Sequence, residues 1–195
     1  MDHLTLRTFI REVETQSRMA LCSYEGLESR VRAIFEGSQA SFIQDSLTFI
    51  HVQSFLSYAA GVSRLLWLKG DELSDSGAAL DAGSVAIVKA RDARNYLEHF
   101  NERLEGWSQL SIRPEMRDAP LDLMVFPLSE LVGTRGSRIE GFDTTNWLRA
   151  LDPNTMEFFL RGHDVRKWDT VSLEQLAVGI RMIHDRATSW LSSHT

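Results

Sequence analysis

The sequence contains one cysteine and four prolines among its 195 residues. Because Cys22 has no second thiol to pair with, an intramolecular disulfide and a classical zinc knuckle or ribbon are excluded. A single thiol fits a reducing compartment. The few prolines and the lack of a polar low-complexity tract argue against disorder, and 43% apolar residues can supply a full core. We therefore expect one globular domain over residues 1–195.

Charge-free stretches are also scarce, and the start of the chain has no apolar run of the kind that directs secretion, since Asp2, Arg7 and Arg11 interrupt it. Residues 46–63 carry no acidic or basic side chain apart from His51 and are long enough to span a bilayer. Their serines, Thr48 and other hydrogen-bonding groups are too many for lipid. We predict a buried core helix here, no membrane partner and a cytoplasmic location.

Positive charge is in deficit, with 21 basic against 27 acidic residues and a net charge of −6. This excludes a general electrostatic attraction of the whole surface to nucleic acid. A contact with RNA would need a local basic patch, and the chain offers one at Lys89, Arg91, Arg94 and Arg103. Tyr96 or Trp107 would be able to stack on a base, although core packing is the favoured role for Trp107.

Apolar residues recur every three to four positions through the first third of the chain, which predicts helix with punctuation at Gly26 and Gly37. From about Gln39 to Leu68 apolar residues occupy most of a second helix's circumference, which indicates a position in the middle of a bundle. Residues 70–83 are rich in Gly, Ser and Asp and predict a loop or a loop with one helical turn. A third helix follows, from about Ser84 to Trp107.

Residues 108–169 differ in character, because alternation in residues 121–125 and 156–160 predicts short strands. Asp152-Pro153-Asn154 supplies a turn, so we expect a β-hairpin. A final helix opens at Ser172, whose hydroxyl can form a capping box with Gln175. The predicted fold is mainly α: a helical bundle of residues 1–107 and 170–192, with a small hairpin-containing β-rich insertion, residues 108–169, before the last helix.

The most suggestive segment for chemistry is Arg94-Asn95-Tyr96-Leu97-Glu98-His99 on the third predicted helix. At 3.6 residues per turn, Asn95 and His99 share a stripe beside the apolar face, where a partly buried site can form. Arg94 points about 140° away from His99 on the same helix. The two side chains can converge through the length of Arg94, through a distortion of the helix, or through a second subunit. The third option is chemically attractive, because two copies packed about a two-fold axis would bring both residues from each subunit into one cleft. We therefore expect a homodimer.

Such a cleft suits metal-independent cleavage of RNA. A histidine can take the 2′-hydroxyl proton and protonate the leaving 5′-oxygen, because its reference pKa of about 6.5 lies near neutrality. Arginine would hold the charge that develops on phosphorus. Asn95 would position His99 or bind phosphate. A simpler alternative is that Arg94 and Glu98 form an ordinary i,i+4 surface pair, with His99 a boundary residue and Asn95 a surface residue.

The R-x4-H pattern formed by Arg94, Asn95 and His99 resembles that of the HEPN superfamily, and residues 98–107 also resemble a stretch of uncharacterised bacterial helical proteins. The HEPN resemblance implies a dimeric, metal-independent endoribonuclease, often the toxin of a toxin–antitoxin pair. It places the catalytic roles on Arg94 and His99, with Asn95 as the accessory, and implies RNA as substrate and a protein antitoxin as partner. The insertion of residues 108–169 is not part of that family's minimal bundle.

Other features favour no further chemistry. His51 is more typical of a satisfied core residue than of a ligand, although it would be able to support His99 if the helices pack together. Neither His163-Asp164 nor His184-Asp185 has the spacing of a helical metal pair, so we assign no metal. Residues 133–138 are more typical of a solvated loop than of an anion cradle, and no cofactor motif occurs. The alternative function is a non-catalytic helical module that binds a protein or nucleotide.

Overall fold

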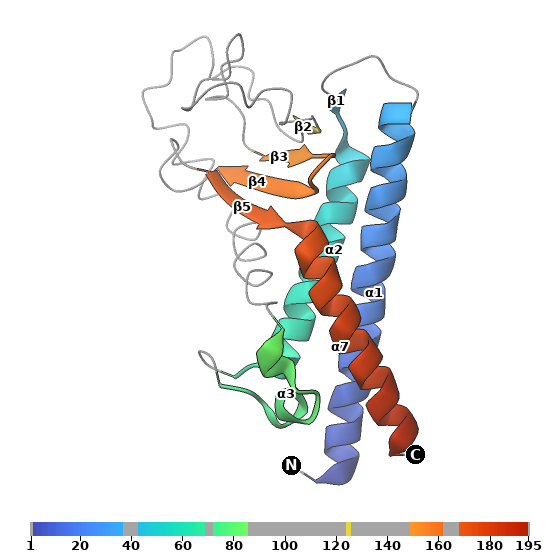
Figure 1. The fold of residues 1–195 in the computed structure, drawn as a ribbon, viewed down its shortest axis with the longest axis vertical. Helices are drawn as coiled ribbons and strands as arrows, with labels where there is room; N and C mark the ends of the chain where they lie inside the picture. Colours follow the sequence, from blue (N-terminus) through green and yellow to red (C-terminus); the bar gives the residue numbers. More distant parts are fainter. Residues whose placement is uncertain are drawn as a thin grey trace. The chain divides into compact units, whose positions relative to one another are not determined.

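A computed structural model describes residues 2–36, 43–68, 72–85, 124–125, 149–161 and 168–194. Its helices are α1 (His3–Glu36), α2 (Ser46–Leu66), α3 (Asp75–Ala79), the 3₁₀ turn η1 (Ala82–Ser84) and α7 (Leu173–Ser193). Its strands are β1 (Ile43–Gln44), β2 (Met124–Val125), β3 (Arg149–Asp152), β4 (Glu157–Arg161) and β5 (Trp168–Ser172) (Figure 1). The prediction of a mainly helical fold with a β-hairpin before the last helix is confirmed.

Contacts along the chain define two compact units. Unit 1 comprises Met1–Glu28, His51–Asn95 and Gln175–Thr195, and unit 2 comprises Ser29–Ile50 and Tyr96–Glu174. The three long helices α1, α2 and α7 each contribute residues to both units. The single domain with an insertion at residues 108–169 stays a prediction.

Helix α1 owes its form to a regular alternation of buried positions at three- and four-residue spacing. These positions are Ile10, Val13, Ser17, Ala20, Tyr24, Leu27, Val31 and Ile34. A repeat that averages 3.5 residues keeps one narrow seam of the helix facing its partners, as in coiled coils. The helix passes through Gly26 without interruption, so the predicted punctuation there is wrong. Gly37 lies outside the described residues.

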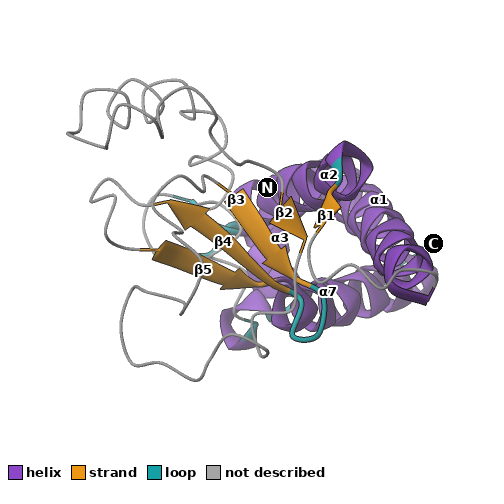
Figure 2. Cartoon of the chain, turned by 90° about the horizontal axis from the view of Figure 1, so that it is seen from above, coloured by secondary structure: helices purple, strands orange, loops and turns teal. Residues whose placement is uncertain are grey.

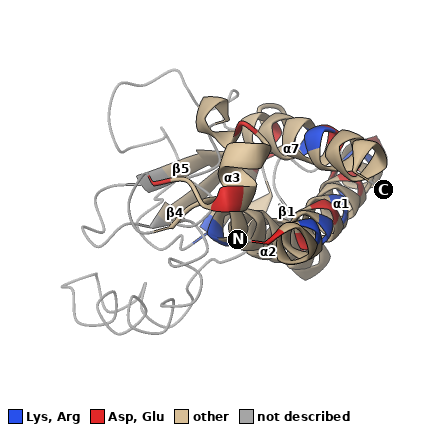
Figure 3. Ribbon diagram, turned by 90° about the horizontal axis from the view of Figure 1, so that it is seen from below, with Lys and Arg blue, Asp and Glu red and all other residues tan. Residues whose placement is uncertain are grey.

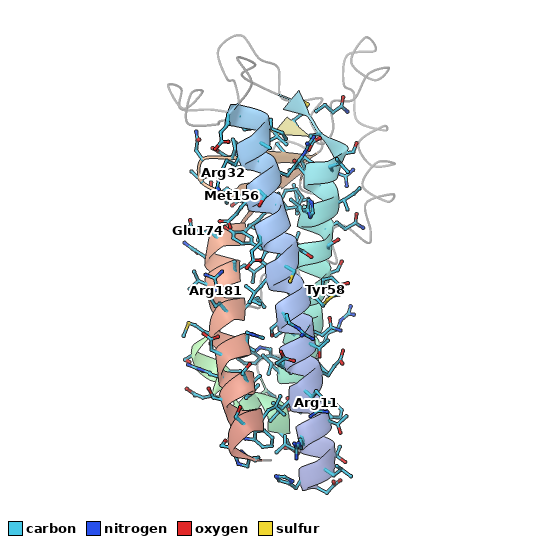
Figure 4. The ribbon with its side chains drawn as sticks, turned by 90° about the vertical axis from the view of Figure 1, so that its right-hand side faces the viewer. Arg11, Arg32, Tyr58, Met156, Glu174 and Arg181 are labelled. Atoms are coloured by element: carbon cyan, nitrogen blue, oxygen red, sulfur yellow. The ribbon has the colours of Figure 1, made fainter. Side chains whose placement is uncertain are left out.

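Within unit 1, α1 runs antiparallel to both α2 and α7 (Figure 4). Tyr24 and Phe55 place their ring centroids 5.3 Å apart between α1 and α2, and Gln16 lies beside Gly61 further along the same pair. On the other side, His3 of α1 lies 6.0 Å from Trp190 of α7, measured between ring centroids. Along each pair of helices, later residues of α1 lie beside earlier residues of α2 or α7. The helices are therefore antiparallel.

Helix α2 begins at Ser46, seven residues later than predicted, because the preceding residues Ile43 and Gln44 form strand β1. The Asp45 carboxylate accepts a hydrogen bond from the Thr48 backbone N–H at 2.9 Å and so caps the helix. Most positions of α2 are buried or half-buried, as expected of a core helix, and the exceptions among its apolar residues lie in its first two turns. Leu47 and Ile50 are 53% and 56% exposed.

In unit 2 the five strands form one sheet in the order β1-β2-β3-β4-β5 (Figure 2). Strands β1 and β2 are antiparallel, β2 and β3 parallel, and β3 to β5 antiparallel, with Asp152 opposite Glu157 at the end of the hairpin. Met156 closes the turn in the left-handed region, at φ 51°. Its carbonyl accepts the Leu173 N–H at 3.0 Å, where β5 passes directly into α7. The predicted hairpin and the start of the last helix are confirmed.

The short helix α3 confirms the expected helical turn within residues 70–83, and it docks closely on the C-terminal end of α2. The Ser74 and Ser76 hydroxyls both donate to the Leu65 carbonyl at 2.7 Å. Arg186 of α7 donates to the Leu80 carbonyl at 3.1 Å, just after α3 ends. Gly77 is buried, and a Cβ placed on it would lie 2.1 Å from the Leu66 carbonyl oxygen. Only glycine fits this approach.

We expect Gly77→Ala to destabilise the protein by about 1–3 kcal/mol, because the clash is with backbone and no side chain can move aside. Alanine is otherwise better than glycine in a helix by about 1 kcal/mol. Gly83→Ala is the matched control, since its Cβ would meet nothing nearer than Leu73 Cδ1 at 3.6 Å. Urea unfolding measures both variants. Equal stability of the two would contradict the close docking of α3.

Candidate functional site

The three predicted catalytic residues, Arg94, Asn95 and His99, lie outside the described residues, between Val85 and Met124. The same holds for the proposed basic patch and for residues 133–138. The pairing of two such helices therefore stays a prediction. The described residues nonetheless contain four polar groupings whose geometry can be assessed.

The first involves His51, which sequence reasoning offered as a core residue or a supporting partner of His99. It lies on α2 with its imidazole against the bare Cα of Gly26 on α1. A Cβ on Gly26 would lie 2.6 Å from Cε1 and 2.8 Å from Nδ1 of the ring. Gly26 is therefore a contact position for an aromatic ring, which explains a glycine in the middle of a long helix. His51 is half-buried.

The second grouping joins the C-terminal part of α1 to the start of α2 in unit 2. Arg30 donates from Nε and Nη2 to the two oxygens of Asp45, at 3.1 and 2.8 Å. Asp45 also accepts hydrogen bonds from the Thr48 hydroxyl, at 2.5 Å, and backbone N–H. The Arg30 hydrogen bond, helped by those from Thr48, holds the pKa of the Asp45 carboxyl far below its usual range. A fork-to-carboxylate pair of this kind is a strong structural clamp.

The third grouping lies in unit 1, where Glu14 Oε1 is 3.9 Å from His184 Nδ1. This nitrogen is buried and has no hydrogen-bond partner, and the buried Ser63 hydroxyl likewise has none. A histidine beside a carboxylate is the arrangement of an oriented general base. The pair lies between α1 and α7 and adds a polar contact to that helix packing.

The fourth grouping is a ring cluster of His3, Trp190 and His194. The imidazole of His194 stacks on the Trp190 indole at 4.1 Å and 7°, and the ring of His3 lies 6.1 Å from that of His194, both measured between centroids. His194 Nδ1 also lies 2.9 Å from the Trp190 carbonyl oxygen. Among the described residues, no group of three or more His, Cys, Asp or Glu side chains is placed to hold a metal ion. The cluster ties α1 to α7.

Two further observations bear on the sequence-based expectations. Cys22 is a free, exposed thiol on α1. No described helix, α2 included, combines the length and apolar character needed to cross a membrane.

Comparison with known proteins adds no assignment: no family model, no curated protein and no solved structure matches this chain.

The sequence analysis did not predict the Arg30–Asp45 clamp, although the sequence does indicate the capping role of Asp45. An aspartate three residues before Thr48, at the beginning of an apolar periodic run, is typical of a helix N-cap. Its arginine partner comes from the preceding helix, fifteen residues earlier. No short-range pattern identifies a contact of that kind.

The clamp predicts a specific sensitivity to acid. Asp45 binds its proton less readily in the folded than in the unfolded chain, so its stabilising contribution is present above about pH 4 and is lost as pH falls. We expect Asp45→Asn, which can still cap α2, to flatten this loss by at least about 1.4 kcal/mol, the equivalent of one pKa unit. Urea unfolding between about pH 6 and pH 2 measures it. The exposed Asp185→Asn is the control, and an equal effect of both substitutions would contradict the clamp.

Proposed function

We propose that this protein is a metal-independent endoribonuclease of the HEPN type that acts as a homodimer. The observation that carries the proposal is the sequence pattern Arg94-Asn95…His99, with arginine and histidine at R-x4-H spacing. The mainly helical fold, with its three long helices, is compatible with the helical scaffold that this resemblance implies.

In this proposal His99 transfers protons to and from the reacting oxygens, and Arg94 stabilises the charge on phosphorus. Asn95 orients His99 or binds phosphate. Because one helix directs Arg94 and His99 about 140° apart, the proposal combines residues from both subunits in each site. The basic residues near the motif, Lys89, Arg91 and Arg103, would attract RNA locally on a chain whose net charge is −6.

Purified wild-type protein is expected to cleave mixed single-stranded RNA in the presence of EDTA. His99→Ala and Arg94→Ala should each lower the cleavage rate by about 10²–10⁴-fold, the range for loss of an acid–base or charge-stabilising group. Rates are read from gel-resolved fragments. The matched controls are His194→Ala and Arg181→Ala, and these should leave the rate unchanged. Arg181 lies on α7 and His194 directly follows it.

Two results would contradict the nuclease proposal. One is no cleavage by a folded, dimeric wild-type protein. The other is cleavage that survives both Arg94→Ala and His99→Ala, because a co-purifying nuclease would then account for it.

The toxin role within this proposal makes a separate prediction in cells. Induced expression of the wild type should arrest growth within a few divisions, whereas His99→Ala should leave the growth rate unchanged, because arrest depends on RNA cleavage. Colony counts after induction, with protein levels matched by immunoblot, measure this. Equal growth of the two strains would remove the toxin role and leave the RNA assay to decide the activity.

The second candidate is a non-catalytic helical module that binds a protein or nucleotide. Val178 and Met182, one turn apart on α7, favour it because both apolar side chains are largely exposed. This candidate requires a folded protein that is inert towards RNA, so the same assay separates the two functions.

A further inference from the structure

The ring cluster of His3, Trp190 and His194 holds two imidazoles close together at one end of the helices of unit 1. His3 lies in the first turn of α1, and His194 directly follows α7. Both ends of the chain are marked at the bottom of Figure 1, and the rings of the two histidines lie 6.1 Å apart between centroids. Because almost the whole sequence separates the two residues, no local spacing pattern reveals this pair.

The hydrogen bonds of His194 decide which of its ring nitrogens can bind a metal ion. Its Nδ1 lies 2.9 Å from the Trp190 carbonyl oxygen, which can only accept, and 3.0 Å from the Ser193 hydroxyl. That hydroxyl donates its own proton to the Ser189 or Trp190 carbonyl, at 3.1 and 3.0 Å, so it too accepts from Nδ1. Nδ1 therefore carries the ring proton, and in the neutral imidazole Nε2 keeps a lone pair.

Histidines bind metal ions in proteins with the same arrangement of hydrogen bonds. A metal-ligating histidine donates its second ring N–H to a carbonyl, a carboxylate or water, which fixes the tautomer and orients the ring. The Trp190 indole is a further constraint, because it stacks on the His194 ring at 4.1 Å and 7°. The electron-rich face of an indole also favours positive charge beside it. Nε2 of His194 is thus an oriented nitrogen donor on an exposed side chain.

His3 is placed near this donor by the N-terminal cap of α1. The Asp2 carboxylate accepts from the Thr5 backbone N–H at 2.9 Å and from the Thr5 hydroxyl at 2.6 Å, which fixes the first turn of the helix. The His3 ring lies 6.0 Å from that of Trp190, so the indole lies beside both imidazoles. The His3 side chain is exposed and its ring torsion is soft, so either ring nitrogen can turn towards an ion.

The separation of the two rings fits one ion between them. A metal ion about 2.1 Å from one nitrogen of each ring lies about 3.2 Å from each centroid, so the centroids can be at most about 6.4 Å apart. The observed distance of 6.1 Å is below this limit. A tetrahedral angle at the metal needs about 5.2 Å, which requires a movement of about 1 Å by the exposed rings.

The donor atoms select the class of ion. Imidazole nitrogens suit Zn²⁺, Cu²⁺ and Ni²⁺, whereas Mg²⁺ and Ca²⁺ prefer oxygen ligands. Figure 3 looks at this end of the structure: acidic and basic residues recur along α1, but α7 has none after Arg186, so no basic side chain of that helix end repels an ion. Two protein ligands leave the remaining positions to water, in keeping with the lack of a three-ligand group in the described part of the chain.

We infer that His3 and His194 together bind one divalent transition-metal ion of the Zn²⁺, Cu²⁺ and Ni²⁺ class, which links the first turn of α1 to the end of α7. The site uses none of Arg94, Asn95 and His99. It is therefore independent of the proposed RNA cleavage, which is assayed with EDTA present. Failure of either proposal leaves the other intact.

Titration calorimetry with Zn²⁺, on protein freed of any affinity tag, tests the site. The wild type should bind one ion per chain. His3→Ala and His194→Ala should each weaken the affinity at least about tenfold, since loss of even an outer-shell partner costs about 10–100-fold. His51→Gln is the matched control, because His51 is a histidine of α2 in the same unit, and it should leave the affinity unchanged. Mg²⁺ should not bind to this pair.

The link between α1 and α7 also predicts an effect of the ion on stability. The two rings are close together only in the folded chain, so Zn²⁺ above its dissociation constant should raise the melting temperature of the wild type. The rise should disappear in His3→Ala, in His194→Ala, and with Mg²⁺ in place of Zn²⁺. Differential scanning calorimetry measures the melting temperature, and circular dichroism checks that the variants fold.

Three outcomes would overturn the inference. The first is Zn²⁺ binding by the wild type that is no tighter than that of the double variant His3→Ala/His194→Ala. The second is an affinity that falls in one alanine variant but not in the other, which would mean that a single histidine holds the ion with other groups. The third is one ion per two chains, which would place the two ligands on different copies.

Discussion

A repeat of 3.5 residues between buried side chains on α1 is the constraint on which unit 1 depends. Helix α1 takes part in the contacts described with α2 and α7: Tyr24 with Phe55, Gly26 with His51, and Glu14 with His184. Because α1 is antiparallel to both α2 and α7, these two run parallel to each other. One polar residue, Ser17, lies within this row of buried positions. Its hydroxyl is not left unsatisfied, because it donates a hydrogen bond to the Val13 carbonyl at 2.6 Å.

The junction between α1 and α2 is governed by polar interactions instead. Asp45 directly follows strand β1 and caps α2, and its second role, as the partner of Arg30, ties this cap to the preceding helix. One carboxylate thereby links the start of α2 to the C-terminal part of α1. Unit 2 then completes its small core from the sheet, where Phe49 meets Phe158 edge to face, with ring centroids 5.9 Å apart.

Periodicity in the sequence was sufficient to predict α1, most of α2, the hairpin and α7, because each buries one face over several turns. It failed where a contact distant in sequence decides the outcome. Strand β1 has two residues and exists only because it pairs with Met124 and Val125. Gly26 was predicted to interrupt a helix, but it lies within α1, where the absence of a side chain leaves room for the His51 ring.

The candidate site was predicted from a short motif and from helix geometry, and not from hydrophobic periodicity. Helix geometry could place Asn95 beside His99 and direct Arg94 away from both, which makes assembly the central question. A single sequence does not contain the distance between two copies of a helix.

The hydrogen bond from the Leu173 N–H to the Met156 carbonyl has a consequence for how this chain can vary in length. It fixes the first residue of α7 relative to the hairpin turn, with strands β4 and β5 in between. Inserting or deleting one residue at the junction of β5 and α7 would turn the helix by about 100°. Leu176, Ile180 and Ile183 would then leave the buried side together. A change in length at this junction is therefore compatible with the buried side of α7 only where it preserves the rotational phase of the helix.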